Sequence, residues 1–128
     1  MADIINLWAV LVAIIASSVL GALWYSPILF LRPWARAAGR EPVQGPSVYA
    51  VALLTAIAAA VAFGWWAGPE PSMGEAMLDG LVVGVFFAAA GLGLHYTFAG
   101  RDLKLWLIDG GFQVARFVLL GVVFGLMG

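Results

Sequence analysis

Hydrophobic residues gather in four long runs along the chain, at residues 4–26, 48–67, 75–98 and 103–127. Each run has about the 20 residues that a helix needs to cross a hydrocarbon core of ~30 Å. The runs are continuous and lack the apolar and polar alternation of barrel strands. Because lipid cannot satisfy free backbone groups, such runs predict helices. The pattern therefore predicts an all-α integral membrane protein with four transmembrane helices.

The connectors between these runs differ sharply in charge. The connector at residues 68–74 has no Lys or Arg, and five of the six Lys and Arg residues of the chain follow the first and third runs: Arg32, Arg36, Arg40, Arg101 and Lys104. The positive-inside rule places both basic connectors in the cytoplasm and both termini outside it. We therefore expect one domain, residues 1–128, of two antiparallel helical hairpins in a cell (inner) membrane.

The longest connector, SPILFLRPWARAAGREPVQGPS, mixes apolar and basic residues and has two interpretations. It is either a loop with ordinary interfacial anchors or a short amphipathic helix that lies in the cytoplasmic headgroup layer. We favour the helix, because it would place Trp34, Arg36 and Arg40 together in that layer. The expected fold thus has a short interfacial segment after the first transmembrane helix.

Composition agrees with a membrane protein and excludes several classes of function. The mean hydropathy is +1.04, with 64% hydrophobic and 10% charged residues, which is far from a soluble domain. A net charge of −1 leaves no basic footprint for nucleic acid. The chain has no cysteine, a lone histidine, no phosphate-binding loop and no nucleophile elbow. We expect no enzyme activity, no catalytic residue, no cofactor and no metal.

Small residues recur at helical spacing in the third and fourth runs. Helices in lipid associate where small residues let their backbones approach closely. The candidate packing residues are Gly80, Gly84, Ala88, Gly91, Gly121 and Gly125. They form either a dimerisation face or a contact within one bundle, and the second interpretation is favoured because such glycine patterns are common.

Polar residues inside the last run, LIDGGFQVARF, are the main candidates for a binding site. Asp109, Gln113 and Arg116 are four and three residues apart, so they share one helical face. A charge near mid-span costs at least ~3 kcal/mol unless it is paired. We therefore expect Arg116 to lean toward Asp109, with Gln113 between them.

His95 and Tyr25 are expected in the same polar layer, with Tyr96 close by. Two interpretations of this layer remain open. It is either a network that fixes helix packing, or a proton-relay or ion-binding site that uses a histidine beside an intramembrane carboxylate. The stretch Leu23-Trp24-Tyr25-Ser26 also resembles Leu94-His95-Tyr96-Thr97, which indicates either a parallel repeat of two hairpins or a chance likeness.

Two stretches carry a family resemblance: GALWYSPILF, with Trp34 following, and FAGRDLKLWLIDGGF. They resemble the signatures of the small membrane-protein family catalogued as domain of unknown function 1761, over nearly the whole chain. The most specific part is Trp24-Tyr25-Ser26-Pro27. The resemblance implies four spans and adds no reaction. The chain departs from the family pattern at Asp109 and Gln113, where relatives tend toward Asn and His, and at Arg116.

Two functions are compatible with these features. The first is a small transporter or channel-like protein for a small solute or ion, with a polar layer formed by Tyr25, His95, Asp109, Gln113 and Arg116. The second is a non-catalytic accessory or scaffold protein that binds other membrane proteins or lipids through its glycine faces and basic connectors. Four spans in 13.5 kDa make a thin wall around any pore, so transport would require at least a homodimer.

Overall fold

The computed structural model describes residues 6–127. The helices in chain order are α1 (Leu7–Trp24), α2 (Leu31–Ala38), α3 (Pro46–Ala67), α4 (Met73–Val82), the π-helix η1 (Val83–Ala89), α5 (Ala90–Phe98) and α6 (Leu103–Met127). No strand occurs in this part of the chain. The start of the first expected run, at Ile4 and Ile5, lies outside the described residues. The expectation of an all-α protein is confirmed.

Four helices are long and apolar enough to cross a membrane: Leu7–Trp24, Pro46–Ala67, Met73–Phe98 and Leu103–Met127. The third of these joins α4, η1 and α5 into one helix, which we call the α4–α5 helix. Local sequence sets the helix starts. The Asn6 side chain accepts hydrogen bonds from the first backbone N–H groups of α1, and Ser72 does the same for α4. Pro46 opens α3, where its missing N–H costs nothing.

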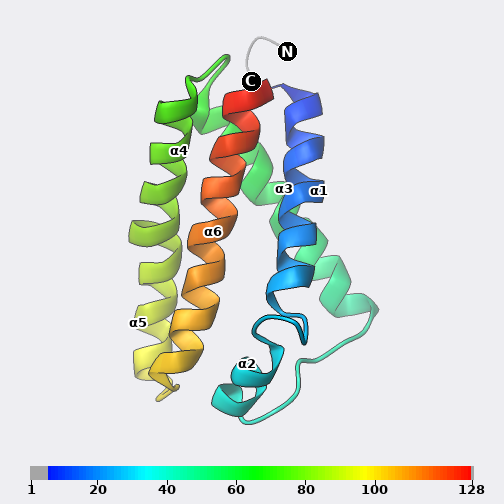
Figure 1. Ribbon diagram of the computed structural model, residues 1–128, viewed down its shortest axis with the longest axis vertical. Coiled ribbons are helices and arrows are strands. Elements are labelled where there is room, and N and C mark those ends of the chain that lie inside the picture. Colours follow the sequence, from blue (N-terminus) through cyan, green and yellow to red (C-terminus); the bar gives the residue numbers. More distant parts are fainter. Residues whose placement is uncertain (1–5, 128) are drawn as a thin grey trace.

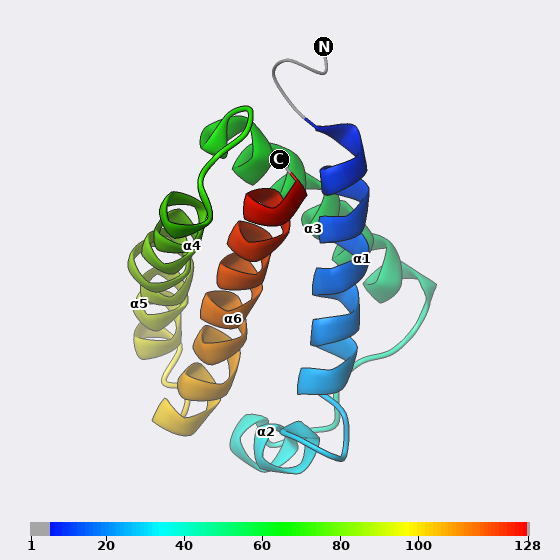
Figure 2. The same ribbon diagram turned by 45° about the horizontal axis from the view of Figure 1, so that its top comes forward.

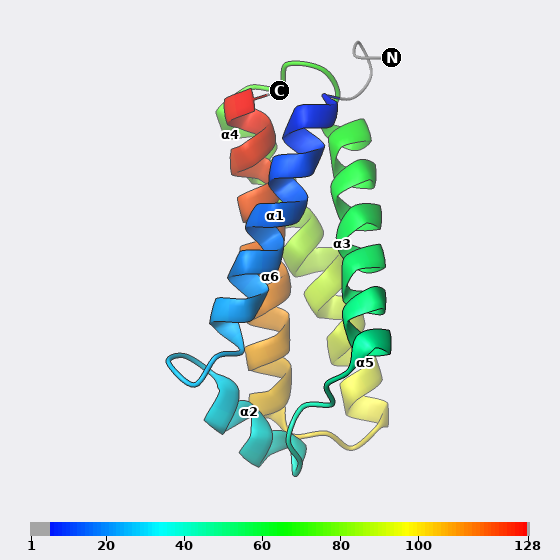
Figure 3. The ribbon, with the colours of Figure 1, turned by 90° about the vertical axis from the view of Figure 1, so that its right-hand side faces the viewer.

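The central helix of the bundle is α6, which contacts every other helix. It lies between the α4–α5 helix and α1, as Figure 2 shows. Consecutive long helices run in opposite directions (Figure 1). At one end, the Asn6 side-chain amide donates to the Met127 carbonyl oxygen at 2.7 Å and joins the start of α1 to the end of α6. At the other end, α2 packs across the start of α6 (Figure 3). We call these the termini end and the α2 end.

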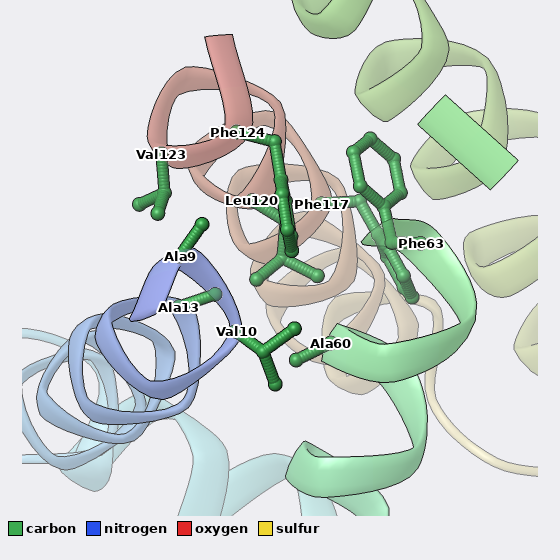
Figure 4. Close-up of a cluster of buried hydrophobic side chains, with 9 residues drawn as sticks. All are labelled: Ala9, Val10, Ala13, Ala60, Phe63, Phe117, Leu120, Val123 and Phe124. Carbon is green, nitrogen blue, oxygen red and sulfur yellow. The ribbon is translucent and has the colours of Figure 1, made fainter. Parts of the chain in front are cut away.

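The hydrophobic core lies toward the termini end, where α1, α3 and α6 meet. Its buried residues are Ala9, Val10, Ala13, Ala60, Phe63, Phe117, Leu120, Val123 and Phe124 (Figure 4). Alanines of α1 and α3 face the large side chains of α6, so small and large side chains interdigitate in the core. The outward faces are also apolar: Phe86 and Phe87 of the third long helix are 69% and 70% exposed. Exposing so extended an apolar surface is unfavourable in water but not in lipid.

Glycines bring the α4–α5 helix and α6 into backbone contact. A Cβ at Gly80 would overlap the Phe117 carbonyl oxygen, and a Cβ at Gly121 would overlap the Ala76 carbonyl oxygen. Gly84 lies in the same way against Val114, and Gly125 against Met73. These four glycines therefore serve a contact within one chain. They allow the close approach that drives helix association in lipid.

Ala88 and Gly91, the other two candidates, lie outside this row. Ala88 packs at the edge of the core, and a Cβ at Gly91 would have no neighbouring atom within 4 Å. The π-helix explains the break. An α-helix would continue the row from Gly84 through residue 88 to Gly91, but the wider π turn shifts it by one residue. The residues that contact α6 are therefore Ala89 and then Gly93.

Candidate functional site

A buried carboxylate at the α2 end of the bundle is the most connected polar group in the structure. Asp109 Oδ1 accepts hydrogen bonds from the Tyr25 hydroxyl at 2.6 Å and from the Trp34 indole N–H at 3.0 Å. Asp109 Oδ2 accepts one from the Tyr96 hydroxyl at 2.5 Å. We call these four residues the Asp109 cluster. Its donors come from three separate elements, so one side chain of α6 ties together the end of α1, α2 and α5.

The chain around Tyr25 is shaped to make these contacts. The Trp24 indole donates to the Ile108 carbonyl oxygen at 3.0 Å, and its ring lies against Gly111, where a larger residue would crowd it. Ser26 caps the end of α1 by donating to the Leu23 carbonyl oxygen. Trp24 and Tyr25 thus dock onto residues 108–111, and the turn after them leads into α2 with Trp34.

On the opposite side of α6, Trp106 makes the matching contact. Its indole donates to the carbonyl oxygen of Ala89, the last residue of the π-helix, at 2.8 Å. The Trp106 ring lies against Gly93 and Gly110, where any side chain would crowd it. This packing fixes the rotation of α5 about its own axis, and that rotation places the Tyr96 hydroxyl next to Asp109.

The Asp109 carboxylate has most of its hydrogen-bonding capacity filled. A carboxylate has about four lone-pair sites, and here three donors occupy its two oxygens. Asp109 is 9% exposed, so little solvent reaches it. Charge-assisted hydrogen bonds of this kind are about twice as strong as neutral ones. The geometry suits a structural junction between helices rather than a proton relay.

Arg116 is the second polar centre and is far less complete. It lies two helical turns, roughly 10 Å, farther along α6 from Asp109. Its Nη2 donates to Gln113 Oε1 at 2.6 Å. Its Cζ lies 4.7 Å from the Phe117 ring centre and 5.8 Å from that of Phe112. Its Nε is buried and has no acceptor among residues 6–127.

No carboxylate within the described chain lies within 4.0 Å of the Arg116 guanidinium. The amide and the two rings solvate the cation: a cation–π contact is worth ~0.5–2 kcal/mol and a hydrogen bond to a charged group ~1.5–3 kcal/mol. Together these offset an insertion cost of ~2.5–3.5 kcal/mol for a mid-span arginine. They leave its charge uncancelled, because all three groups are neutral.

A protein-family model described as "Protein of unknown function (DUF1761)" matches residues 8–125. The chain belongs to the DUF1761 family. Neither a curated protein nor a solved structure matches the chain. The match confirms the resemblance found in the sequence, and it covers all four residues of the Asp109 cluster. The family description names no activity, so the function of this DUF1761 protein has to be argued from its site.

The five residues expected in one polar layer divide into separate groups in this DUF1761 protein. Tyr25 joins Asp109, and Gln113 joins Arg116. The expected bridge from Arg116 to Asp109 is absent, because three closer donors already occupy the carboxylate. His95 is exposed, and its side chain makes no hydrogen bond with the described residues. The one-residue shift of the π-helix turns Tyr96 toward α6 and His95 away from it.

One cluster residue was missed by sequence reasoning, and one was only placed nearby. The sequence places Trp34 in the headgroup layer, although the family stretch GALWYSPILF with Trp34 following is a signal that these residues act together. Tyr96 was expected close to the layer without a role. The two stretches compared as a repeat, 23–26 and 94–97, place Tyr25 and Tyr96 on the two oxygens of the same carboxylate.

Replacing Trp34 with phenylalanine should loosen α2 while the bundle stays folded. The change keeps an aromatic ring and removes one hydrogen bond to a carboxylate, which is worth ~1.5–3 kcal/mol. We expect faster amide hydrogen exchange across residues 31–38 and a lower melting temperature. Trp65→Phe is the matched control, since Trp65 is 64% exposed. Equal exchange in both variants would show that Trp34 does not hold α2.

Proposed function

We propose that this protein is a multi-pass membrane protein that binds and moves a small anionic solute at Arg116, without enzyme activity. The proposal rests on one observation: a guanidinium at mid-span has a buried Nε without an acceptor and no carboxylate within 4.0 Å among residues 6–127. Arg116 is 13 residues, roughly 20 Å, from the start of a 25-residue helix, so its head is too deep to reach the interface easily.

An anion would be attracted to the Arg116 guanidinium more strongly at this site than to the same group in water. At 4 Å, two unit charges attract by about 1 kcal/mol in water and about 4 kcal/mol at an effective dielectric of 20. Gln113 supports binding because it orients Nη2, and the rings of Phe112 and Phe117 restrict the guanidinium without neutralising it. Intramembrane ionisable groups that face neighbouring helices commonly mark solute pathways.

The positions of the basic residues and of the exposed tryptophans support one orientation of the protein in the membrane. We place the protein as two antiparallel hairpins in a cell (inner) membrane, with α2 in the cytoplasmic headgroup layer and both termini outside. Five of its six Lys and Arg residues belong to α2, its flank, the connector before α6 and the first turn of α6. At the termini end, Trp8, Trp65 and Trp66 are 72%, 64% and 66% exposed, as in an aromatic belt.

We further propose that the working unit is a homodimer. Because α6 fills the centre of the bundle and contacts all other helices, a single copy has no central lumen. A solute that reaches Arg116 would pass along a surface completed by a second copy. The mass of the protein in lipid nanodiscs checks this: a dimer is expected, and a monomer at all protein concentrations would contradict it.

Replacing Arg116 with methionine should abolish anion movement and leave the fold intact. Replacing an incompletely satisfied buried charge with an apolar residue is often neutral or stabilising. In reconstituted vesicles we expect chloride, acetate or phosphate uptake by the wild type, at least ten-fold slower uptake by Arg116→Met and intermediate uptake by Arg116→Lys. Potassium uptake should stay at the level of protein-free vesicles.

Two further variants make the test specific. His95→Leu removes a polar residue that lies apart from Arg116. Asp79→Asn removes the charge of an acidic residue of the third long helix. Both variants should keep the wild-type uptake. If Arg116→Met and the wild type move these anions equally, or if neither exceeds protein-free vesicles, anion transport is wrong. The alternative function, a non-catalytic scaffold that binds membrane proteins or lipids, would then stand.

A further inference from the structure

An apolar groove opens at the α2 end, on a different side of α6 from the Asp109 cluster. It encloses about 270 Å³ and is lined by Trp24, Phe30, Pro33, Lys104, Leu107 and Ile108. It runs between the end of α1, the turn into α2 and the first turns of α6. Ligand pockets for whole small molecules have volumes of ~300–1,000 Å³, so this groove suits part of one flexible chain.

The walls of the groove are held in place by contacts already described. The Phe30 ring lies 4.8 Å from the Trp24 ring, and the Trp24 indole is hydrogen-bonded to the Ile108 carbonyl oxygen. Leu107, in the lining, is 60% exposed, and Ile28 of the turn into α2 is 81% exposed. The groove is thus a preformed apolar trough that continues onto a lipid-facing surface.

Its one charged lining residue is a lysine without a partner. The side chain of Lys104 makes no hydrogen bond or ion pair with any residue in the range 6–127. The carboxylate of Asp102 accepts from the Lys104 backbone N–H at 2.8 Å instead, as a helix cap. The ammonium group therefore offers its donors at the edge of an apolar trough.

The surroundings of the groove are strongly positive. The exposed charges of the α2 end are five cations and two acids, a balance of +3 (5 − 2): Arg32, Arg36, Arg40, Arg101, Lys104, Glu41 and Asp102. Basic pockets between membrane helices attract the phosphate groups of anionic lipids, and a Lys or Arg that contacts the phosphate directly adds about five-fold in affinity. An apolar trough with a cation at its edge, inside a positive field, matches an acyl chain that carries an anionic phosphate.

We infer that an anionic phospholipid binds here, with one acyl chain in the groove and its phosphate on Lys104. The site is independent of Arg116 and of the proposed transport. Binding would brace the junction of α1, α2 and α6, because the lipid touches all three. The protein would therefore be stabilised by lipid bound at Lys104, whose side chain is unpaired among residues 6–127.

The test uses delipidated protein in a neutral detergent and measures melting temperature and lipid adducts by native mass spectrometry. The probes are palmitoyl-oleoyl phosphatidylglycerol, palmitoyl-oleoyl phosphatidylcholine and glycerol phosphate. Phosphatidylglycerol should bind at least five-fold more tightly than phosphatidylcholine and raise the melting temperature, and glycerol phosphate should do neither. Lys104→Gln should weaken phosphatidylglycerol binding about five-fold, and Leu107→Trp should fill the groove and weaken it at least as much.

Matched controls separate a site from a diffuse charge effect. Arg40→Gln removes one cation from the same end without touching the groove, and Leu126→Trp enlarges an exposed residue at the other end. Both should keep the preference for phosphatidylglycerol. Equal binding of the two lipids, an equal loss in Arg40→Gln and Lys104→Gln, or binding of glycerol phosphate alone would overturn the inference.

Discussion

Replacing Asp109 with alanine should destabilise the protein by about 3–5 kcal/mol. The change leaves the partly buried Tyr25, Tyr96 and Trp34 donors without their acceptor; an unsatisfied buried donor costs ~1–3 kcal/mol, and partly buried donors fall at the lower end of that range. Because these donors sit on three elements, their loss weakens the whole α2 end at once. Thermal unfolding in detergent should show a fall of roughly 10 °C or more.

A repacked variant sharpens this prediction. Combining Asp109→Leu with Tyr25→Phe and Tyr96→Phe removes the acceptor and two donors together, so it should recover a large part of the lost stability. Asp79→Ala is the matched control, because the Asp79 carboxylate accepts no hydrogen bond from residues 6–127. If Asp109→Ala and Asp79→Ala melt alike, the Asp109 cluster is not the junction described here.

Replacing Gly121 with alanine should cost about 3 kcal/mol, an effect that one added methyl group seldom has. The new Cβ would overlap the Ala76 carbonyl oxygen, so two helix backbones would have to separate. Overpacking typically costs ~1–3 kcal/mol, and backbone cannot yield as a flexible side chain does. Gly80→Ala, which would overlap the Phe117 carbonyl oxygen, should behave in the same way. Thermal unfolding of each variant measures the loss.

Gly91→Ala is the internal control for both glycine variants. Its Cβ would meet nothing within 4 Å, and alanine is a better helix former by ~1 kcal/mol. This variant should be neutral or slightly more stable. A loss of stability in Gly91→Ala similar to that in Gly121→Ala would mean that the third long helix packs through a different face.

Local sequence determined a large part of the architecture. Apolar runs of membrane length predicted four long helices, since lipid permits no other solution for their backbones. Tyr25 was expected near Asp109 because chain direction places the end of one helix and the start of another at similar depth. Depth along a helix follows from counting residues, so sequence predicts it well.

Rotation about a helix axis is harder to predict, because one added residue in a turn changes it. The π-helix at Val83–Ala89 moved Gly91 and His95 away from α6 and brought Gly93 and Tyr96 to it. Nothing in the letters VGVFFAA distinguishes a π turn from an α turn, since every residue of the stretch is apolar or small and suits either face of the helix. The change in rotation becomes visible only in the folded bundle, where the glycine face and Trp106 pack between the third long helix and α6.

For this protein, the sequence by itself determined the number of long helices, their approximate positions and the gathering of positive charge in two connectors. Each of these depends on residues that are neighbours in the chain. Only the tertiary structure decided that Trp34 and Tyr96 bind Asp109 and that Arg116 has no acid partner among residues 6–127. Those outcomes depend on which donors lie within hydrogen-bonding distance of the Asp109 carboxylate. The side chains involved belong to four helices that meet only when the bundle is packed.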